Sequence, residues 1–84
     1  MINIEEFQKY IGELCKLKNN TNTMLCYYKH DVVMVIETNT IFIPLEIRHY
    51  TYKNGTFRLK ILVNNIIGYL YFYGDLNKFI EPVQ

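Results

Sequence analysis

The sequence contains no serine, alanine or tryptophan, and only four glycines, two prolines and two cysteines. Without serine, the chain cannot be a hydrolase of the serine-nucleophile type. The glycines are scattered, so there is no glycine-rich loop to hold a phosphate group. The longest uncharged stretch, residues 61–74, has 14 residues, whereas a membrane-spanning helix needs about 20. The acidic N-terminal segment lacks the features of a signal peptide, so we expect a cytoplasmic protein with no membrane association.

The cysteines and histidines form no catalytic or metal-binding pattern. Cys15 and Cys26 are far apart in the sequence, and no ligand pair of the Cys-x-x-Cys type is present. We predict that both are free thiols that pack against apolar neighbours rather than react. His30 and His49 are isolated, and no carboxylate has an evident acid–base partner. The sequence therefore predicts no metal site, no cofactor and no enzymatic activity.

The composition points to the origin of the gene. Phe, Tyr, Met, Ile, Asn and Lys together make 43 of the 84 residues, whereas Gly, Ala, Arg and Pro make only 8. The first group is encoded by AT-rich codons and the second by GC-rich ones. We expect an AT-rich genome, such as that of a low-GC bacterium, its phages or mobile elements, or a virus. The apolar fraction of 50% and the net charge of +1 indicate a folded chain, and the length indicates one domain over residues 1–84.

Residues 4–18 have the spacing of an amphipathic helix. Its apolar side chains recur three and four residues apart, at Ile4, Phe7, Ile11 and Leu14. Acidic residues begin this segment and lysines end it, which matches the helix dipole. A run of Asn and Thr at 19–23 then ends the helix. We predict one helix over residues 4–18.

The rest of the chain is rich in β-branched and aromatic residues separated by short polar breaks, which indicates strands. The predicted strands cover residues 24–29, 32–37, 41–43 continuing through 45–52, 56–63 and 66–73. Pro44 lacks a backbone donor, so its strand should lie at an edge or bulge there. A short turn capped by Asp75 should follow at Leu76–Ile80. The pattern predicts an α+β fold: an N-terminal amphipathic helix packed on one face of a four- to five-stranded, mostly antiparallel sheet.

Two turns predict the register of the last three strands. A two-residue turn at Asn54-Gly55 would place Tyr52 opposite Phe57. A similar turn at Asn64-Asn65 would place Leu59 opposite Leu70. One face then collects the residues expected in the core: Tyr50, Tyr52, Phe57, Leu59, Ile61, Val63, Ile66, Gly68, Leu70 and Phe72. The opposite face, called the open face below, collects Thr51 and the predicted partner-binding residues: His49, Lys53, Arg58, Lys60, Tyr69, Tyr71 and Tyr73.

The open face has three interpretations. Tyrosines between cations suit an acidic protein partner, because Tyr and Arg are frequent interface anchors. They also suit a single-stranded nucleic acid, whose bases would stack on the rings. Cross-strand Lys–Tyr and Arg–Tyr pairs can instead stabilise an exposed face with no ligand at all. The sequence pI of about 7.7 favours protein over nucleic acid, since dedicated nucleic-acid binders are usually strongly basic.

The segment 32–37 is apolar on both of its faces, which is typical of a strand buried on both sides. The helix can bury only one side. We expect the other side to be covered by the C-terminal segment Leu76–Val83 folding back, by self-association or by a partner protein. The predicted self-association residues are Val33, Met34, Val35 and Ile36.

From these features we expect a non-enzymatic protein-binding module that acts by steric occlusion of a partner. An inhibitor or host-defence antagonist (an anti-CRISPR-like role) from an AT-rich phage, mobile element or virus fits the size and composition. It would then act in the host cell cytoplasm. The first alternative is a single-stranded nucleic-acid-binding protein that uses the Tyr/Lys/Arg face. The second is a homodimeric structural or assembly protein.

Overall fold

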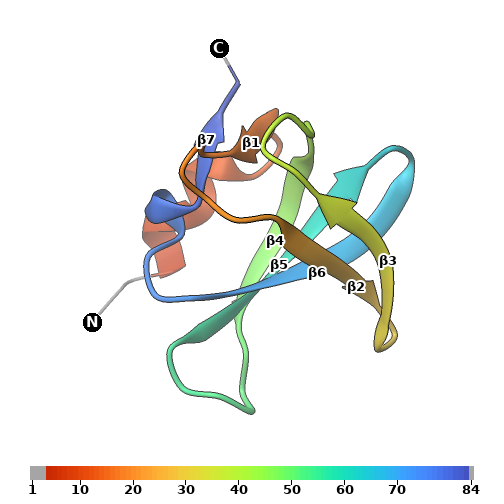
Figure 1. Ribbon diagram of the computed structural model, residues 1–84. Coiled ribbons are helices and arrows are strands. Elements are labelled where there is room, and N and C mark those ends of the chain that lie inside the picture. Colours follow the sequence, from red (N-terminus) through yellow and green to blue (C-terminus); the bar gives the residue numbers. More distant parts are fainter. Residues whose placement is uncertain (1–3, 84) are drawn as a thin grey trace.

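The computed structural model describes residues 4–83, and β6 lies at the centre of a five-stranded antiparallel sheet (Figure 1). The strand order is β3-β2-β6-β5-β4, and β1 and β7 form a separate two-stranded antiparallel sheet. The elements in chain order are η1 (Ile4–Tyr10), β1 (Cys15–Leu17), β2 (Met24–Tyr28), β3 (Asp31–Ile36), β4 (Ile43–His49), β5 (Thr56–Val63), β6 (Ile66–Tyr73), η2 (Leu76–Lys78) and β7 (Ile80–Pro82). Both η1 and η2 are 3-10 helices. A small fold based on a mostly antiparallel sheet with one short N-terminal helix agrees with the coarse α+β prediction.

The N-terminal helix is shorter than predicted, because η1 ends at Tyr10 rather than at Lys18. Gly12 follows it with φ +84°, a left-handed conformation that ends helices and that glycine adopts without steric cost. Cys15 and Leu17 then alternate inward as part of β1, and both are completely buried. Leu14, predicted on the apolar stripe of the helix, is 52% exposed.

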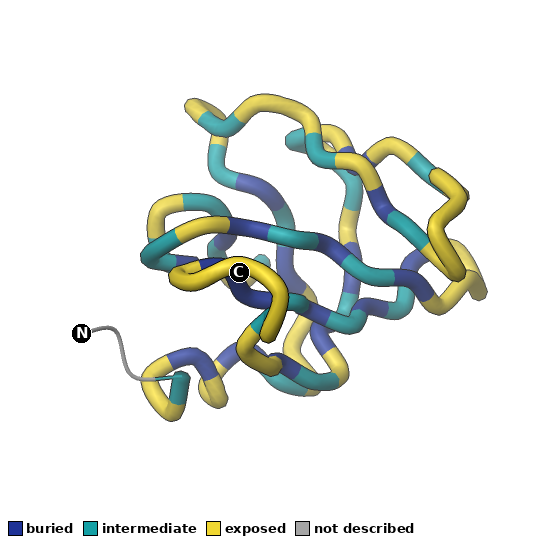
Figure 2. Tube along the Cα trace, turned by 90° about the horizontal axis from the view of Figure 1, so that it is seen from below, coloured by how far each residue is buried: buried dark blue, intermediate teal, exposed yellow. Residues whose placement is uncertain are grey.

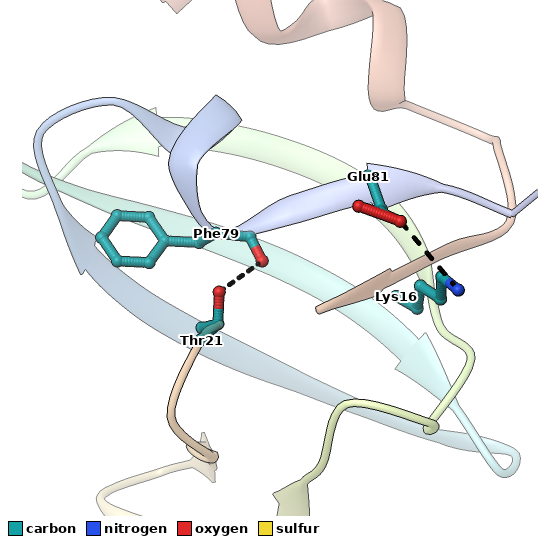
Figure 3. A network of polar contacts seen from close by, with 4 residues as sticks. All are labelled: Lys16, Thr21, Phe79 and Glu81. Atoms are coloured by element: carbon teal, nitrogen blue, oxygen red, sulfur yellow. Dashed lines mark hydrogen bonds and ion pairs between the residues drawn. The ribbon is translucent and has the colours of Figure 1, made fainter. Parts of the chain in front are cut away.

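The C-terminal segment pairs with β1 and so closes one end of the molecule. Leu17 is opposite Ile80, and Cys15 is opposite Pro82. Beside this pairing, Lys16 Nζ lies 4.0 Å from Glu81 Oε1 (Figure 3). The hydroxyl of Thr21 donates to the Phe79 carbonyl at 3.3 Å, which ties the segment before β2 to the same strand pair. The predicted turn after Asp75 is present as η2, with the Asp75 carboxylate accepting from the Asn77 backbone N–H at 3.0 Å.

The β5–β6 hairpin has the predicted register. Asn64 and Asn65 have φ of 48° and 63°, as the central residues of a type I′ turn require. Leu59 is accordingly opposite Leu70, and Lys60 is opposite Tyr69. Pro44 lies in β4, which is an edge strand and whose pairing is irregular between Pro44 and Glu46, so both features predicted for this proline are present.

The β4–β5 register differs from the prediction by three residues, because Asn54-Gly55 does not form a two-residue turn. Arg48 is opposite Arg58 rather than Ile61, and residues 50–55 form a longer loop. A shift by an odd number of residues moves the side chains of residues 46–49 to the other face of the sheet, whereas the irregularity after Pro44 returns the start of β4 to the predicted faces. Tyr50 and Tyr52 are therefore not core residues: they lie in the loop, and Tyr52 is 88% exposed.

The prediction that the segment 32–37 is buried on both sides is wrong within this chain. β3 is an edge strand, and its exposed residues include Val32 at 49% and Val35 at 46%. Only Ile36 is fully buried there, while Met34 packs partly against the core. The C-terminal segment, one of the three covers considered for this strand, pairs with β1 instead.

The core lies between the sheet and the helical segments, which gather on one of its sides (Figure 1). The Phe7 ring of η1 packs edge-on against Phe57 and Phe72, with ring centroids 5.7 and 6.3 Å apart. The Phe57 and Phe72 rings stack on each other at 5.4 Å. From Phe57 to Val63, buried and partly exposed residues alternate along β5, which places the odd-numbered side chains in the core. Figure 2 shows such alternation of burial along the chain trace.

The contact between β6 and β2 makes Gly68 a sensitive position. A Cβ there would lie 2.3 Å from the Cys26 sulfur and 3.2 Å from the Tyr27 carbonyl oxygen. We expect Gly68→Ala to lower the free energy of unfolding by about 1–3 kcal/mol, the usual cost of overpacking, in urea denaturation. Cys26→Ala in the same chain should restore part of the loss, because it removes the closer atom. Equal stability of Gly68→Ala and the unmodified protein would contradict this packing.

Candidate binding cleft

A cleft of about 670 Å³ lies between the β2–β3 turn and the loop of residues 50–55. Its floor is formed by β5 and β6, on the open face of the sheet. The lining residues are Tyr27, Lys29, His30, Tyr50, Lys53, Thr56, Arg58, Tyr69, Tyr71, Phe72 and Tyr73. The set contains three cations and no Asp or Glu.

The β5–β6 register explains why these floor residues meet. Arg58 is opposite Tyr71, and Thr56 is opposite Tyr73. Since opposed residues of an antiparallel pair point to the same face, the even-numbered residues of β5 and the odd-numbered residues of β6 share the open face. That local pairing was predictable from the Asn64-Asn65 turn.

Five of the seven predicted partner-binding residues line the cleft: Lys53, Arg58, Tyr69, Tyr71 and Tyr73. Lys60 is on the open face, opposite both Tyr69 and Glu46, but does not line the cleft. His49 was predicted on this face and is on the other one. It is opposite the buried Phe57, with the two ring centroids 4.8 Å apart, as the three-residue register shift requires.

Sequence reasoning missed several lining residues, chiefly Tyr27, Lys29, His30 and Tyr50. Tyr27 is opposite Tyr69 because β2 pairs with β6, strands that are far apart in the sequence. No local pattern predicts that pairing. Lys29 and His30 form the β2–β3 turn, with φ of 49° and 73°.

The tyrosines of the cleft pack against one another. The Tyr71 ring lies edge-to-face with Tyr50 at 5.1 Å and with Tyr27 at 5.8 Å. Tyr50 also contacts Tyr52 at 5.5 Å. Such pairs contribute roughly 0.5–1.5 kcal/mol beyond the area that they bury. The cleft wall is therefore held in place without a ligand, whereas Tyr73 remains 68% exposed.

Arg58 lies over an aromatic ring and forms no ion pair with the described residues. Its guanidinium lies 4.8 Å from the centroid of the Tyr69 ring, a cation–π contact. The ion pairs found among residues 4–83 are Lys16–Glu81 and Arg48–Glu46, so no carboxylate of this part of the chain lies within ion-pair distance of Arg58. The charge of Arg58 acts on Glu46 only from further away.

Glu46 moderates the charge at one side of the open face. Its carboxylate lies 3.0 Å from Arg48 Nε, and Arg48 Nη2 donates a hydrogen bond to it at 3.2 Å. That hydrogen bond is the main reason why the pKa of Glu46 lies below its ordinary value. The charges of Arg48, Lys60 and Arg58 lower the pKa further. The cations of this face thus act on one shared carboxylate that lies outside the cleft.

Neither thiol has the surroundings of a nucleophile. Cys15 and Cys26 are fully buried and are free thiols with no disulfide bond, as predicted. Burial raises the pKa of Cys15 to about 11 and also raises the pKa of Cys26. Within residues 4–83, no three His, Cys, Asp or Glu side chains are grouped so as to hold a metal ion. The same residues include no helix long and apolar enough to cross a membrane.

The environment of Glu46 predicts a pH effect with a defined sign. Because its folded-state pKa lies below the unfolded value, its interactions stabilise the fold above that unfolded value and are lost as pH falls through the folded one. In a carboxyl-carbon NMR titration, we expect Glu46 to titrate below its ordinary pKa. Arg48→Ala should raise the midpoint, because it removes the main cause. A midpoint that does not move in Arg48→Ala would contradict the assigned hydrogen bond.

No protein-family model matches the sequence, and no curated protein and no solved structure matches it either. The function must therefore be inferred from the residues of the cleft and their surroundings.

Proposed function

We propose that this chain is a non-enzymatic protein-binding module that docks onto a partner through the open face and its cleft. The observation that carries the proposal is the charge of the lining: beside its tyrosines it includes the cations Lys29, Lys53 and Arg58, and it includes no Asp or Glu. Surfaces of opposite charge steer association and select partners. Tyr and Arg are also the residues in which binding energy is most often concentrated.

The packing of the rings favours a protein partner over single-stranded nucleic acid. Bases bind to such sheets by stacking on exposed aromatic faces. Here the guanidinium of Arg58 occupies a place over Tyr69, and Tyr71 already has two ring neighbours. The net charge of +1 also gives little of the sequence-independent attraction to phosphates that nucleic-acid binding requires.

The mechanism that fits a chain of this size is steric occlusion. A standard interface buries about 800 Å² on each partner. That is roughly one-seventh of the 5701 Å² surface of this protein, so an interface of standard size would cover a substantial part of so small a molecule. The AT-rich composition supports an inhibitor or host-defence antagonist, comparable in role to an anti-CRISPR protein, from a phage, mobile element or virus.

The class of partner can be tested by photocrosslinking from the exposed position of Tyr73. A photoreactive phenylalanine analogue placed there should form adducts with protein in the lysate of a low-GC bacterium, and nuclease treatment should leave the adducts intact. The same analogue at Glu13, an exposed position that does not line the cleft, is the control and should not form them. Nuclease-sensitive adducts specific to position 73 would replace this proposal with the nucleic-acid alternative.

A second candidate function is self-association into a homodimeric structural or assembly protein. The supporting observation is β3, an edge strand with exposed Val32, Val33 and Val35 and without the lysine or proline that usually protects such edges. Of the predicted self-association residues, Val33 and Val35 are exposed, whereas Ile36 is buried and Met34 partly so. Substitution of Met34 would therefore disturb the core as well.

Val35→Lys tests self-association without disturbing the core, because Val35 is exposed. If β3 joins two copies, the unmodified 10.1 kDa chain should sediment at about twice its mass, and the lysine should return it to monomer. Leu14→Lys, at another exposed apolar position, should leave the dimer intact. A monomeric unmodified protein at high concentration would exclude this function.

A further inference from the structure

We infer that the occupant of the cleft is a short acidic peptide segment of the partner, with one of its carboxylates bound by the guanidinium of Arg58. The inference rests on the proposed function and names the chemistry that the cleft recognises. Three observations support it: the convergence of cations from separate elements, the position of Arg58 over the Tyr69 ring, and the size of the cleft.

The cations reach the cleft from three different parts of the chain. Lys29 comes from the β2–β3 turn, Lys53 from the loop after β4, and Arg58 from β5. Like charges around one hollow repel one another, and no carboxylate of the cleft lining offsets them. A bound anion relieves that repulsion, so the arrangement favours a ligand that carries more than one negative charge.

The guanidinium of Arg58 suits a hydrogen-bond acceptor that has two oxygens in one plane, such as a carboxylate. Its cation–π contact with Tyr69 favours one position of the guanidinium over that ring, while the N–H groups of its fork form no ion pair with a carboxylate of residues 4–83. Arginine binds carboxylates and phosphates through two parallel hydrogen bonds. A side chain that is already held in place loses less conformational entropy when it binds.

The loop that carries Lys53 is also held in place. The Tyr50 N–H donates to the Thr56 carbonyl at 2.8 Å, and the Gly74 N–H donates to the Gly55 carbonyl at 3.0 Å. Gly55 has φ +78°, and a Cβ there would lie 2.6 Å from the Tyr73 ring. The loop therefore fits closely beside β6 and keeps its lysine at the border of the cleft.

The size of the cleft limits what enters it. Its volume of about 670 Å³ is within the range of about 300–1,000 Å³ found for ligand pockets. It can take a few side chains, while the rest of a partner contacts the surrounding face. Because a guanidinium already lies over the Tyr69 ring and Tyr71 has two ring neighbours, we expect stacked bases to gain less here than carboxylates do.

The test uses two fluorescent probes of equal net charge: an oligopeptide of alternating glutamate and glycine, and an oligothymidylate. Fluorescence anisotropy should show tighter binding of the peptide. Arg58→Ala should weaken peptide binding by roughly tenfold or more, the value of a charge-assisted hydrogen bond, and Lys53→Ala by roughly threefold. Arg58→Lys keeps the charge without the fork and should fall between Arg58→Ala and the unmodified protein.

Lys9→Ala is the matched control, because it removes an exposed cation on η1 that does not line the cleft. It should change peptide binding by less than about twofold, since a rim or distant charge contributes little. An equal loss in Lys9→Ala and Arg58→Ala would overturn the inference, since binding would then follow net charge alone. Tighter binding of the oligothymidylate, or no peptide binding, would also overturn it.

Amide NMR spectra of the unmodified protein give a second measurement that needs no variant. Adding the peptide should shift the amides of residues 29–30, 53–58 and 69–73, and shifts confined to other residues would overturn the inference. Failure here and failure of the proposed function are distinguishable. If position 73 forms nuclease-resistant protein adducts but the peptide does not bind, the proposed function stands and this inference fails. The chain would then be a protein-binding module whose cleft does not recognise acidic segments.

Discussion

The two-residue turn at Asn64 and Asn65 sets the register of β5 against β6, and both faces of the sheet depend on that register. It places Phe57 beside Phe72 on the side covered by η1, and Arg58 beside Tyr71 on the open side. A slip by one residue would exchange the two faces and bring Arg58 and Lys60 into the core. Since burying an unpaired charge costs several kcal/mol, the core and the cleft are fixed by the same pairing.

The charges are distributed unevenly in a nearly neutral chain. Five of the nine Lys and Arg residues lie on β4, β5 or the two segments beside the cleft: Lys29, Arg48, Lys53, Arg58 and Lys60. Arg48 is directly opposite Arg58, an arrangement that is unfavourable by itself. The ion pair of Arg48 with Glu46 offsets one of the two charges and leaves the guanidinium of Arg58 without a carboxylate partner. The local electrostatics thus keep the cleft positive.

The sequence predicts what short-range chemistry determines. The strands of the five-stranded sheet, the Asn64-Asn65 turn, the irregularity at Pro44 and the capped turn after Asp75 follow from neighbouring residues, whereas β1 and β7 were not predicted. Five predicted binding residues meet in the cleft for the same reason.

The predictions fail where a segment fits two local patterns or where the structure depends on contacts between residues far apart in the sequence. Residues 14–17 satisfy both a helical and an alternating pattern, and the left-handed conformation of Gly12 decides between them. Asn54-Gly55 is typical of a two-residue turn, yet residues 50–55 form a longer loop. Its ends are joined by the hydrogen bond from the Tyr50 N–H to the Thr56 carbonyl, and Gly55 lies close to the Tyr73 ring. The contribution of Tyr27 depends on the β2–β6 pairing, which no local pattern encodes.

The small size of the domain links its stability to its binding surface. η1 packs on one side of the sheet, through Phe7, and the β1–β7 pair closes one end, so the open face must be stabilised by its own side chains. It is stabilised by the Tyr27–Tyr71 and Tyr50–Tyr71 ring contacts and by the cation–π contact of Arg58 with Tyr69. These contacts hold the same side chains that line the cleft in one arrangement. A face that orders itself in this way offers a partner rigid anchors, and binding then costs less conformational entropy than on a face of mobile side chains.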